Sequence, residues 1–288
     1  MVPHPRIRHN VNTRPNAGIS DISLGTDASA PLGDRSAAGL WQGKLADKEL
    51  RVPTVAVVAA LEREVWPFVG NWPTNRREYD GRSYKFFEKE HMVVVCGGVG
   101  SEAARRATEA IINLYHPVLV ISAGFAGALD PSLPPGHTLT PRHVIDAGDG
   151  SRTESSSGEG VLVSFATIAD VEQKAKLAKA FGAHAVDMEA AAVAKATQVH
   201  RVKFLACKVI SDPSDSRLPP IARFIGADGR FHALKFIAYI ALRPRLWQSV
   251  RRLMRDSTTA ATQLCEALAI TTKSGAVSSD ARTAGWKA

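Results

Sequence analysis

Three short, largely apolar segments constrain the fold of this chain more than any other feature of its sequence. They span residues 54–60, 118–122 and 204–210, and each has the length of a single β-strand. Apolar runs without polar alternation are typical of strands that are buried on both faces of a parallel sheet. Helical patterns are expected between them, over residues 101–115 and 171–181. This order of strands and helices predicts the α/β fold class.

The two ends of the chain differ in composition from the part between them. Residues 1–50 are rich in Pro, Gly, Ser, Asn and Asp, so we expect a disordered N-terminal arm. The arm has no continuous apolar stretch of the secretory type, and we expect a cytoplasmic protein. Residues 270–288 form a polar tail that we also expect to be disordered. One folded domain is therefore predicted over residues 51–269.

Charge and cysteine content narrow the function classes. The formal net charge of +8 favours an anionic partner or surface. The three cysteines are interpreted as reduced core thiols, two of them within apolar strand-like runs. The chain contains no Cys-x-x-Cys or His-Glu-x-x-His spacing and its histidines are scattered, so we infer no metal site.

Acidic residues mark two points where candidate elements end or begin. Asp187 and Glu189 flank Met188 where an extended segment turns into a helical pattern, and Ser211 and Asp212 end the strand over residues 204–210. One interpretation is structural: Asp187 caps a core helix that begins there, because acidic residues suit the first turn of a helix. The other is functional, because open α/β folds bind ligands at the carboxyl ends of their strands.

Two glycine-rich segments also follow predicted strands. Residues 97–103 open the helix over 101–115, as a dinucleotide-binding loop would. They follow a predicted hairpin (residues 83–88 and 91–96), however, and no acidic residue ends a strand about twenty residues later, which argues against nicotinamide binding. Exposed backbone N–H groups at such a helix start favour anions or ribose oxygens. In residues 123–127, glycines would let the backbone approach a ligand closely.

Taken together, these motifs resemble the nucleoside phosphorylase and nucleosidase superfamily. The likeness is strongest to its methylthioadenosine/S-adenosylhomocysteine nucleosidase branch. It rests on four motifs in the family's order, at residues 55–65, 94–101, 121–129 and 187–212. The resemblance implies a single-domain, three-layer α/β/α fold with a mixed, largely parallel central sheet. It also implies an enzyme that cleaves purine N-glycosidic bonds, acts as a homodimer and needs no cofactor.

The resemblance assigns roles to individual residues. Asp212 would be the acid that protonates the leaving purine, and Glu64 would be the base that activates water. We expect apolar strand residues to surround the Asp212 carboxyl group. Substrate-binding roles fall on Glu189, Met188, Asp187, Gly98, Ala123, Gly124, Phe125, Phe165 and Ser211. Glu189 would bind the ribose hydroxyls, and Met188 would pack on the sugar or the base.

The choice of nucleophile is argued from charge. A phosphorylase must hold phosphate, but Gly97 stands where the family commonly has serine, and Glu64 would repel an anion. Arg63 could bind phosphate, although we expect it to point away from the site because it adjoins Glu64. Water is therefore the favoured nucleophile. The alternatives are a phosphate-dependent phosphorylase and a non-catalytic paralogue that binds a nucleoside or lipid.

The C-terminal part of the chain suggests a substrate. Residues 209–220, 242–247 and 255–257 resemble the hopanoid-associated phosphorylase subgroup, which implies removal of adenine from adenosylhopane. Two departures leave base specificity open: Asp187 is shorter than the usual glutamate, and the loop over 166–170 lacks the phenylalanine that often stacks on the purine. Phe125 or Phe165 could replace it.

Residues 230–268 are expected to form a packed helix pair that ends the domain. The alternative is that these residues form a basic amphipathic element that lies on an anionic membrane surface. The expected partners are therefore a small-molecule nucleoside and a second copy of the chain. Under the alternative interpretation of residues 230–268, a membrane surface at the inner face is a further partner. No nucleic acid partner is expected.

Overall fold

The structure is a computed structural model that describes residues 55–226 and 228–283, with side chains up to Thr272. The expected N-terminal arm (1–50) lies outside the described residues, as do the last five residues. The strands are β1 (Val55–Ala59), β2 (Thr74–Tyr79), β3 (Arg82–Lys89), β4 (Met92–Cys96), β5 (Leu119–Ala128), β6 (Thr138–Leu139), β7 (His143–Asp146), β8 (Arg152–Glu154), β9 (Val161–Ser164), β10 (Ala185–Asp187) and β11 (Lys203–Asp212). The α-helices are α2 (Glu62–Val69), α3 (Ser101–Tyr115), α4 (Val171–Phe181), α5 (Ala190–Val199), α6 (Ala233–Ala241) and α7 (Trp247–Thr283), and two 3₁₀ turns are η1 (Ile221–Phe224) and η2 (Pro244–Leu246).

A mixed sheet forms the centre of the domain, which confirms the predicted fold class. The strands follow the order β2-β3-β4-β1-β5-β10-β9-β7-β8, and β11 pairs with β5 and β6. The inner strands β4, β1, β5 and β11 run parallel to one another. The β2–β3–β4 meander is antiparallel, and β10 and β6 run antiparallel to β5 and β11, respectively. Because β5 pairs with β1, β10 and β11, it is the central strand of the sheet.

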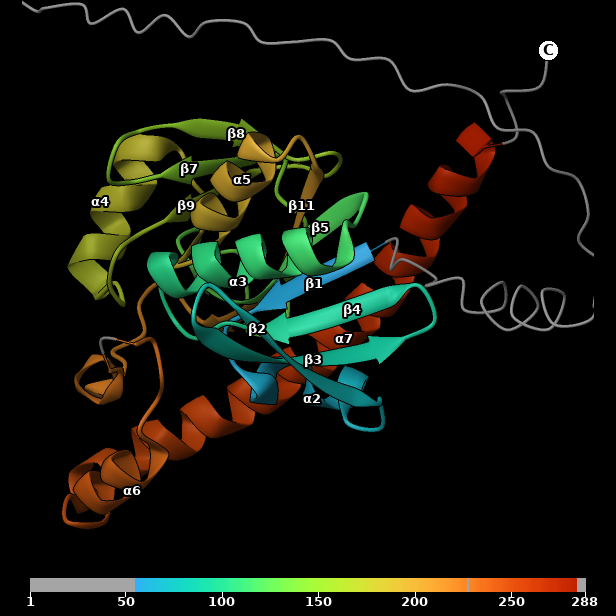
Figure 1. Cartoon of the computed structure of the whole chain (residues 1–288). Helices are drawn as coiled ribbons and strands as arrows, with labels where there is room; N and C mark the ends of the chain where they lie inside the picture. Colours follow the sequence, from blue (N-terminus) through green and yellow to red (C-terminus); the bar gives the residue numbers. More distant parts are fainter. Residues whose placement is uncertain (1–54, 227, 284–288) are drawn as a thin grey trace, which may run out of the picture. The chain divides into compact units, whose positions relative to one another are not determined.

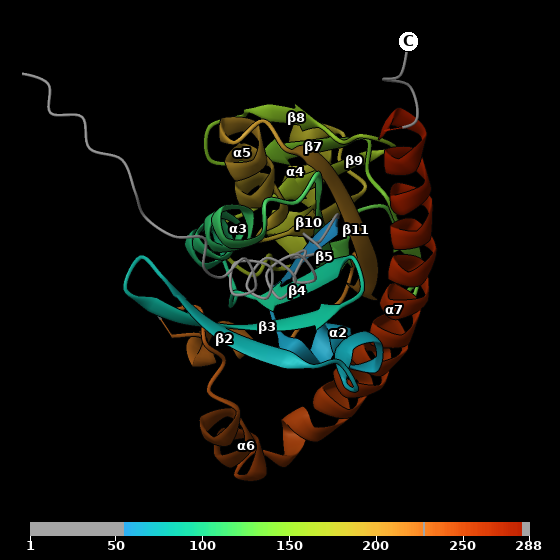
Figure 2. The same ribbon diagram turned by 45° about the vertical axis from the view of Figure 1, so that its right-hand side comes forward.

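Helices cover both faces of the central strands, as Figures 1 and 2 show: α3 and α5 lie on one face, and α2 and α7 lie on the other. The strand β1 illustrates why. Its residues Ala56 and Val58 belong to the core beneath α3 and α5, and Val55, Val57 and Ala59 belong to the core beneath α2 and α7. Since successive side chains on a strand point to opposite faces, a wholly apolar strand needs a cover on both sides.

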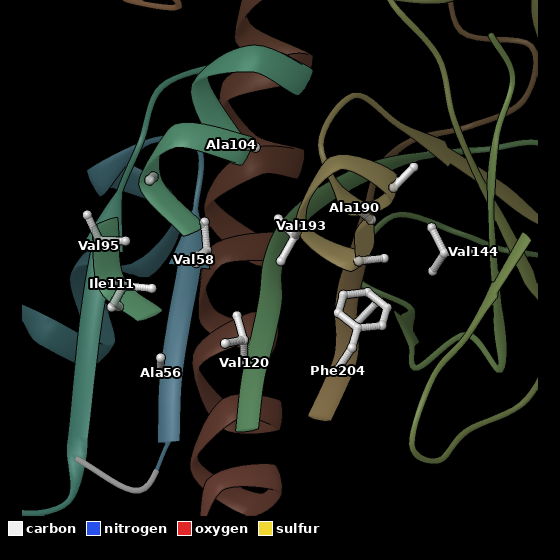
Figure 3. Close-up of a cluster of buried hydrophobic side chains, with 14 of the residues drawn as sticks. Ala56, Val58, Val95, Ala104, Ile111, Val120, Val144, Ala190, Val193 and Phe204 are labelled. Carbon is white, nitrogen blue, oxygen red and sulfur yellow. The ribbon is translucent and has the colours of Figure 1, made fainter. Parts of the chain in front are cut away.

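The first of these cores is packed from small and β-branched residues. Figure 3 shows Ala104 and Ile111 of α3, and Ala190 and Val193 of α5, meeting strand residues such as Val120. The many alanines on these helices let the helix backbones approach the sheet closely. A third, smaller core lies beneath α4 and contains Leu177 and Val163.

Local signals account for where α4 begins and ends. Asp170 and Gln173 form a reciprocal capping box, and Gly182 ends the helix with a left-handed φ of 58°. These limits agree with the expected helix over residues 171–181.

Three boundaries differ from the sequence-based expectations. The glycine-rich residues 123–127 are part of the long strand β5 and not a loop. The helix expected from Asp187 begins at Ala190, because Asp187 still pairs with Ser164 of β9. Helix α7 continues to Thr283, through part of the tail for which we expected disorder.

Two helices, α6 and α7, are present at the C-terminal end as expected, but α6 buries only Ile240. Helix α7 packs along α2 and β11 and contributes Ala260, Leu264 and Leu268 to the second core. Among the helices of residues 55–283, none combines the length and the apolar content that a membrane span requires.

Candidate active site

A cavity of about 910 Å³, measured out to its open mouth, lies where several strands end. Its walls come from the segment after β1, from the second half of β5, and from the ends of β10 and β11. Residues from α2, α4, η1 and α7 complete the enclosure. This is the place at which α/β folds bind their ligands.

The three predicted acidic residues meet in this cavity. Glu64 arrives on α2, Glu189 stands before α5, and Asp212 ends β11, and all three line the same space. The other predicted residues that line it are Met188, Asp187, Ser211 and Phe125. Gly98, Ala123, Gly124 and Phe165 are not among its lining residues.

Gly124 and Phe165 show why sequence position alone misplaced some of these residues. A Cβ added at Gly124, whose φ is +151°, would lie 3.2 Å from Oε2 of Glu64, so this glycine makes room for a carboxyl group of the chain itself. Phe165 packs against the core beneath α4, and Ala123 belongs to the core beneath α2 and α7. Phe125 therefore remains the only one of the two candidate phenylalanines at the cavity.

Glu64 is buried at the third position of α2. The backbone N–H of Leu61 donates to its Oε2 at 3.2 Å, and its side chain lies near the buried Lys208. Burial raises the pKa of Glu64 above its ordinary value, and the hydrogen bond and the lysine only partly offset this effect. A carboxyl group with a raised pKa is a stronger base than an exposed glutamate when it is ionised.

Glu189 joins two segments that are far apart in the sequence. The N–H of Gly100, at the start of α3, donates to its Oε1 at 2.7 Å. The glycine loop thus binds an anion, as its pattern predicted, but this anion is a side chain of the protein. Burial, followed by the neighbouring Asp187, raises the pKa of Glu189 to about 7.

Asp187 is held by three donors. The hydroxyl of Ser164 donates to Oδ1 at 2.5 Å, and the N–H of Ala190 donates to Oδ2 at 2.9 Å. The third partner is Lys208, whose ammonium nitrogen lies 2.9 Å from Oδ2 with both side chains almost fully buried. Burial opposes the charge of Lys208, but Asp187, Glu189 and Glu64 outweigh it and raise the pKa of the lysine.

The end of β11 carries a β-bulge. Its register against β5 shifts between Ile210 and Asp212, so that Asp212 lies opposite Gly127. In a regular strand, Ser211 and Asp212 would point to opposite faces, whereas here both line the cavity. The hydroxyl of Ser211 donates to Oδ1 of Asp212 at 2.7 Å.

Asp212 is paired with a lysine, which corrects the expectation of a purely apolar surrounding. Lys174 on α4 forms a buried ion pair with Oδ2 of Asp212. Its ammonium group also donates to the carbonyl oxygen of Pro213 at 2.6 Å. Burying an unpaired carboxylate is costly, so a strand end of this kind requires a donor or a cation.

Sequence reasoning missed two lysines and misplaced one arginine. Lys208 stands in a buried strand, and a lysine in such a position is seldom without an acidic partner, which was a usable signal. Lys174 precedes Leu177 by three residues and so shares its buried helix face. Arg63, expected to point away, lines the cavity, and its guanidinium group lies 5.6 Å from the ring centroid of Phe231. Within residues 55–226 and 228–283, no group of three or more His, Cys, Asp or Glu side chains is placed to hold a metal ion.

The pKa of Glu189 leads to a prediction about stability. Because its pKa rises from 4.5 to about 7 on folding, the folded state loses stability relative to the unfolded state as the pH increases through this interval. Glu189→Gln should therefore raise the free energy of unfolding at pH 8 by roughly 1–3 kcal/mol and change it little at pH 5. Urea unfolding at both pH values measures this difference. The exposed variant Glu159→Gln serves as the control, and an equal effect of Glu189→Gln at both pH values would contradict the prediction.

Comparison with known proteins places this site in a family. The model of the Phosphorylase superfamily matches residues 54–170 and 156–223. A 5'-methylthioadenosine/S-adenosylhomocysteine nucleosidase of Staphylococcus aureus is 28% identical over 196 residues, which cover 55% of this chain and 86% of the relative. The fold is similar to that of a nucleosidase of the same name from Neisseria meningitidis (TM-score 0.57, 21% identity, 77% of this chain and 99% of that one). It is also similar to the futalosine hydrolase of Helicobacter pylori (TM-score 0.55, 20% identity, 75% and 97%). The chain belongs to the Phosphorylase superfamily.

Proposed function

We propose that this protein hydrolyses the N-glycosidic bond of a 5′-substituted adenosine and releases adenine. The proposal rests mainly on the observation that Glu64, Glu189 and Asp212 line the same cavity. The similarity to curated 5'-methylthioadenosine/S-adenosylhomocysteine nucleosidases supports the same conclusion.

The three side chains suit the three needs of the reaction. The leaving purine is a poor anion, so Asp212 would donate a proton to the base. The ribose needs a fixed orientation, which Glu189 would provide by accepting hydrogen bonds from its hydroxyl groups. Glu64 would remove a proton from the attacking water, since its raised pKa favours proton uptake. This division of acid and base roles resembles that in glycoside hydrolysis, where the transition state is similar to an oxocarbenium ion.

The charge of the cavity favours water over phosphate as the nucleophile. Its lining includes four acidic residues (Glu64, Asp187, Glu189 and Asp212) and two basic ones (Arg63 and Lys174). Lys174 is already paired with Asp212. A phosphate dianion would meet an excess of negative charge in a partly desolvated site, where Coulomb repulsion is strong.

The reaction can be tested by chromatography of the products formed from methylthioadenosine and S-adenosylhomocysteine, with and without phosphate. We expect free adenine and no dependence on phosphate. Asp212→Asn and Glu64→Gln should each lower kcat by about 10²–10⁴-fold, since each removes one proton-transfer group. Glu159→Gln, on the surface, is the matched control. Formation of the 1-phosphate of the 5-substituted ribose, such as 5-methylthioribose-1-phosphate from methylthioadenosine, would assign the protein to the phosphorylases. Nucleoside binding without any product would assign it to the non-catalytic paralogues.

A second cavity extends the site toward α7 and suggests an apolar 5′ substituent. It shares Arg63, Phe125, Ile221, Phe231, Leu253 and Ser257 with the first cavity. Beyond these, its lining is mostly apolar and includes Trp66, Phe236, Val250 and Met254. A ribose held by Glu189 could direct a 5′ chain into this space, which agrees with adenosylhopane as the substrate that we propose.

A series of 5′-alkylthioadenosines of increasing chain length tests this proposal. Each methylene that becomes buried should raise kcat/KM by up to about fourfold, because its transfer from water contributes about 0.8 kcal/mol. Val250→Asp should remove most of this gain and leave the rate with methylthioadenosine unchanged. Val199→Asp, at an exposed position of α5, is the control. A kcat/KM that does not depend on chain length would exclude an apolar 5′ pocket.

We also propose that the region around α6 contacts the surface of an anionic membrane. Large apolar side chains are exposed there: Leu234 (83%), Ile237 (60%), Leu242 (81%), Trp247 (47%) and Met254 (65%). Basic side chains lie in the same segment, at Lys235, Arg243, Arg245, Arg251, Arg252 and Arg255. Exposed apolar groups surrounded by basic residues are typical of peripheral membrane contacts.

Sedimentation with vesicles measures this contact. We expect binding to vesicles that contain phosphatidylglycerol and much weaker binding to pure phosphatidylcholine. Replacement of Arg251, Arg252 and Arg255 by Ser should weaken binding by roughly 10²-fold, at about 1 kcal/mol for each basic residue. The triple variant of Arg76, Arg82 and Arg152, which lie on exposed strand positions, has the same change in charge and should bind normally. Equal loss in both triple variants would show that only net charge matters.

A further inference from the structure

The buried ion pair between Lys174 and Asp212 has a property that the reaction needs. Lys174 is only 2% exposed and reaches the cavity from α4, 38 residues before Asp212. Its ammonium group donates both to Asp212 and to the carbonyl oxygen of Pro213, and the hydroxyl of Ser211 donates to the other carboxylate oxygen. The carboxyl group is therefore surrounded by donors and is held in a fixed orientation.

Space for this pair is provided by the backbone of β5. A Cβ at Gly127 would lie 3.1 Å from Oδ2 of Asp212 and 3.2 Å from the ammonium nitrogen of Lys174. Such contacts are tighter than nine in ten real Cβ contacts, so glycine at this position lets the lysine approach the carboxylate without a shift of either side chain. The bulge in β11 contributes as well, because it turns Asp212 toward Gly127.

A carboxylate that only accepts hydrogen bonds has no proton to donate to a leaving base. The ion pair as a whole does have a proton to donate. A lysine ammonium beside an aspartate carboxylate holds the same number of protons as a neutral lysine amine beside an aspartic acid. The proton required by the leaving purine can thus be stored on the lysine while Asp212 remains the group that faces the substrate.

We propose that Lys174 and Asp212 form a proton-sharing pair in which the lysine supplies, through Asp212, the proton taken up by the leaving base. The inference rests on the proposed nucleosidase function. As the glycosidic bond breaks, its electron pair stays with the purine, one N–H bond of Lys174 breaks and an O–H bond forms on Asp212. The O–H proton then passes to a nitrogen of the base, so the base leaves neutral and Lys174 remains a neutral amine.

The proton balance closes with the second half of the reaction. Water adds its oxygen to the anomeric carbon and loses one proton to Glu64. Exchange with solvent removes this proton from Glu64 and returns one to Lys174. In this scheme Lys174 acts through Asp212 and does not contact the reacting atoms, which makes it a positioning and proton-supplying residue.

Other charged groups face the pair from the surrounding elements. The shared cavity also contains Arg63, Glu64, Asp187 and Glu189. A neighbouring cavity on the side of the loop after β11 contains Asp215, Arg217, Arg252 and Asp256. These groups are the same in every Lys174 variant, so differences between the pH profiles of the variants report on the lysine itself.

Lys174→Arg and Lys174→Met separate proton supply from simple charge pairing. Arginine keeps the cation and the ion pair but does not release a proton in proteins, so Lys174→Arg should lower kcat by about 10²-fold or more and change KM by less than about threefold. Methionine has no proton to donate, so in Lys174→Met the proton for the leaving base must be held by Asp212 itself. Lys174→Met should therefore be active in mild acid, and its rate should fall on the alkaline side at least about 2 pH units earlier than that of the wild type.

The experiment measures adenine release by the full chain between pH 5 and 10, with thermal melting of each variant. Lys176→Arg and Lys176→Met, on the exposed face of the same helix, are the matched controls and should follow the wild-type profile. If Lys174→Arg does not fold, the profile of Lys174→Met decides alone. Wild-type kcat in a folded Lys174→Arg variant, or an unshifted alkaline limb in Lys174→Met, would overturn the proton-sharing pair. Absence of adenine release by the wild type would instead refute the proposed function.

Discussion

The buried ion pair between Lys208 and Asp187 is the interaction on which the rest of the site depends. It joins the middle of β11 to the end of β10, and it also places a cation beside Glu64 and Glu189. Burying a lysine or an aspartate alone would cost several kcal/mol, whereas the pair offsets much of this cost. Asp187 in addition binds the first N–H of α5 and the hydroxyl of Ser164, so the same carboxylate fixes where the helix and its preceding Glu189 lie.

The remaining carboxyl groups differ because their neighbours differ. Burial is the largest influence on Glu64 and Glu189 and raises the pKa of each, whereas Asp212 forms an ion pair with Lys174. Carboxyl groups in different surroundings have different pKa values, so one can act as an acid and another as a base within the same small site. Glycines are essential to this arrangement: Gly124 leaves room for Glu64, and Gly127 leaves room for Lys174 and Asp212. Their function is to let side chains of the protein approach one another.

Helix α7 connects the candidate active-site cavity to the surface of the molecule. Its buried residues Leu264 and Leu268 pack on the sheet, and its earlier residue Leu253 lines both cavities. At its start, the helix contacts η2, which in turn contacts α6, and large apolar side chains are exposed in this region (Figure 2). Helix α7 thus links the core, the proposed 5′ pocket and the proposed membrane contact. This arrangement agrees with the proposal that the substrate is an amphiphilic nucleoside bound from a lipid surface.

The sequence alone determined the main buried strands, the helices α3 and α4 and the identity of the acidic residues, because these follow from local patterns. The wholly apolar run at residues 55–59 requires cover on both faces, and the capping residues Asp170 and Gly182 set the ends of α4. Family motifs predicted that Glu64, Glu189 and Asp212 share one cavity, which the structure confirms. They could not predict the partners of these residues.

Only the tertiary structure decided which cation each acid receives and which predicted residues reach the cavity. Lys174 meets Asp212 across 38 residues of chain, and Gly100 meets Glu189 across 89. Such contacts depend on strand register, and the single bulge near Ser211 reverses the side to which the following side chain points. Register and bulges are set by packing between distant segments, so no pattern within one segment encodes them. For this reason, the carboxyl groups were visible in the sequence, whereas the cations and hydrogen-bond donors that pair with them were determined by the fold.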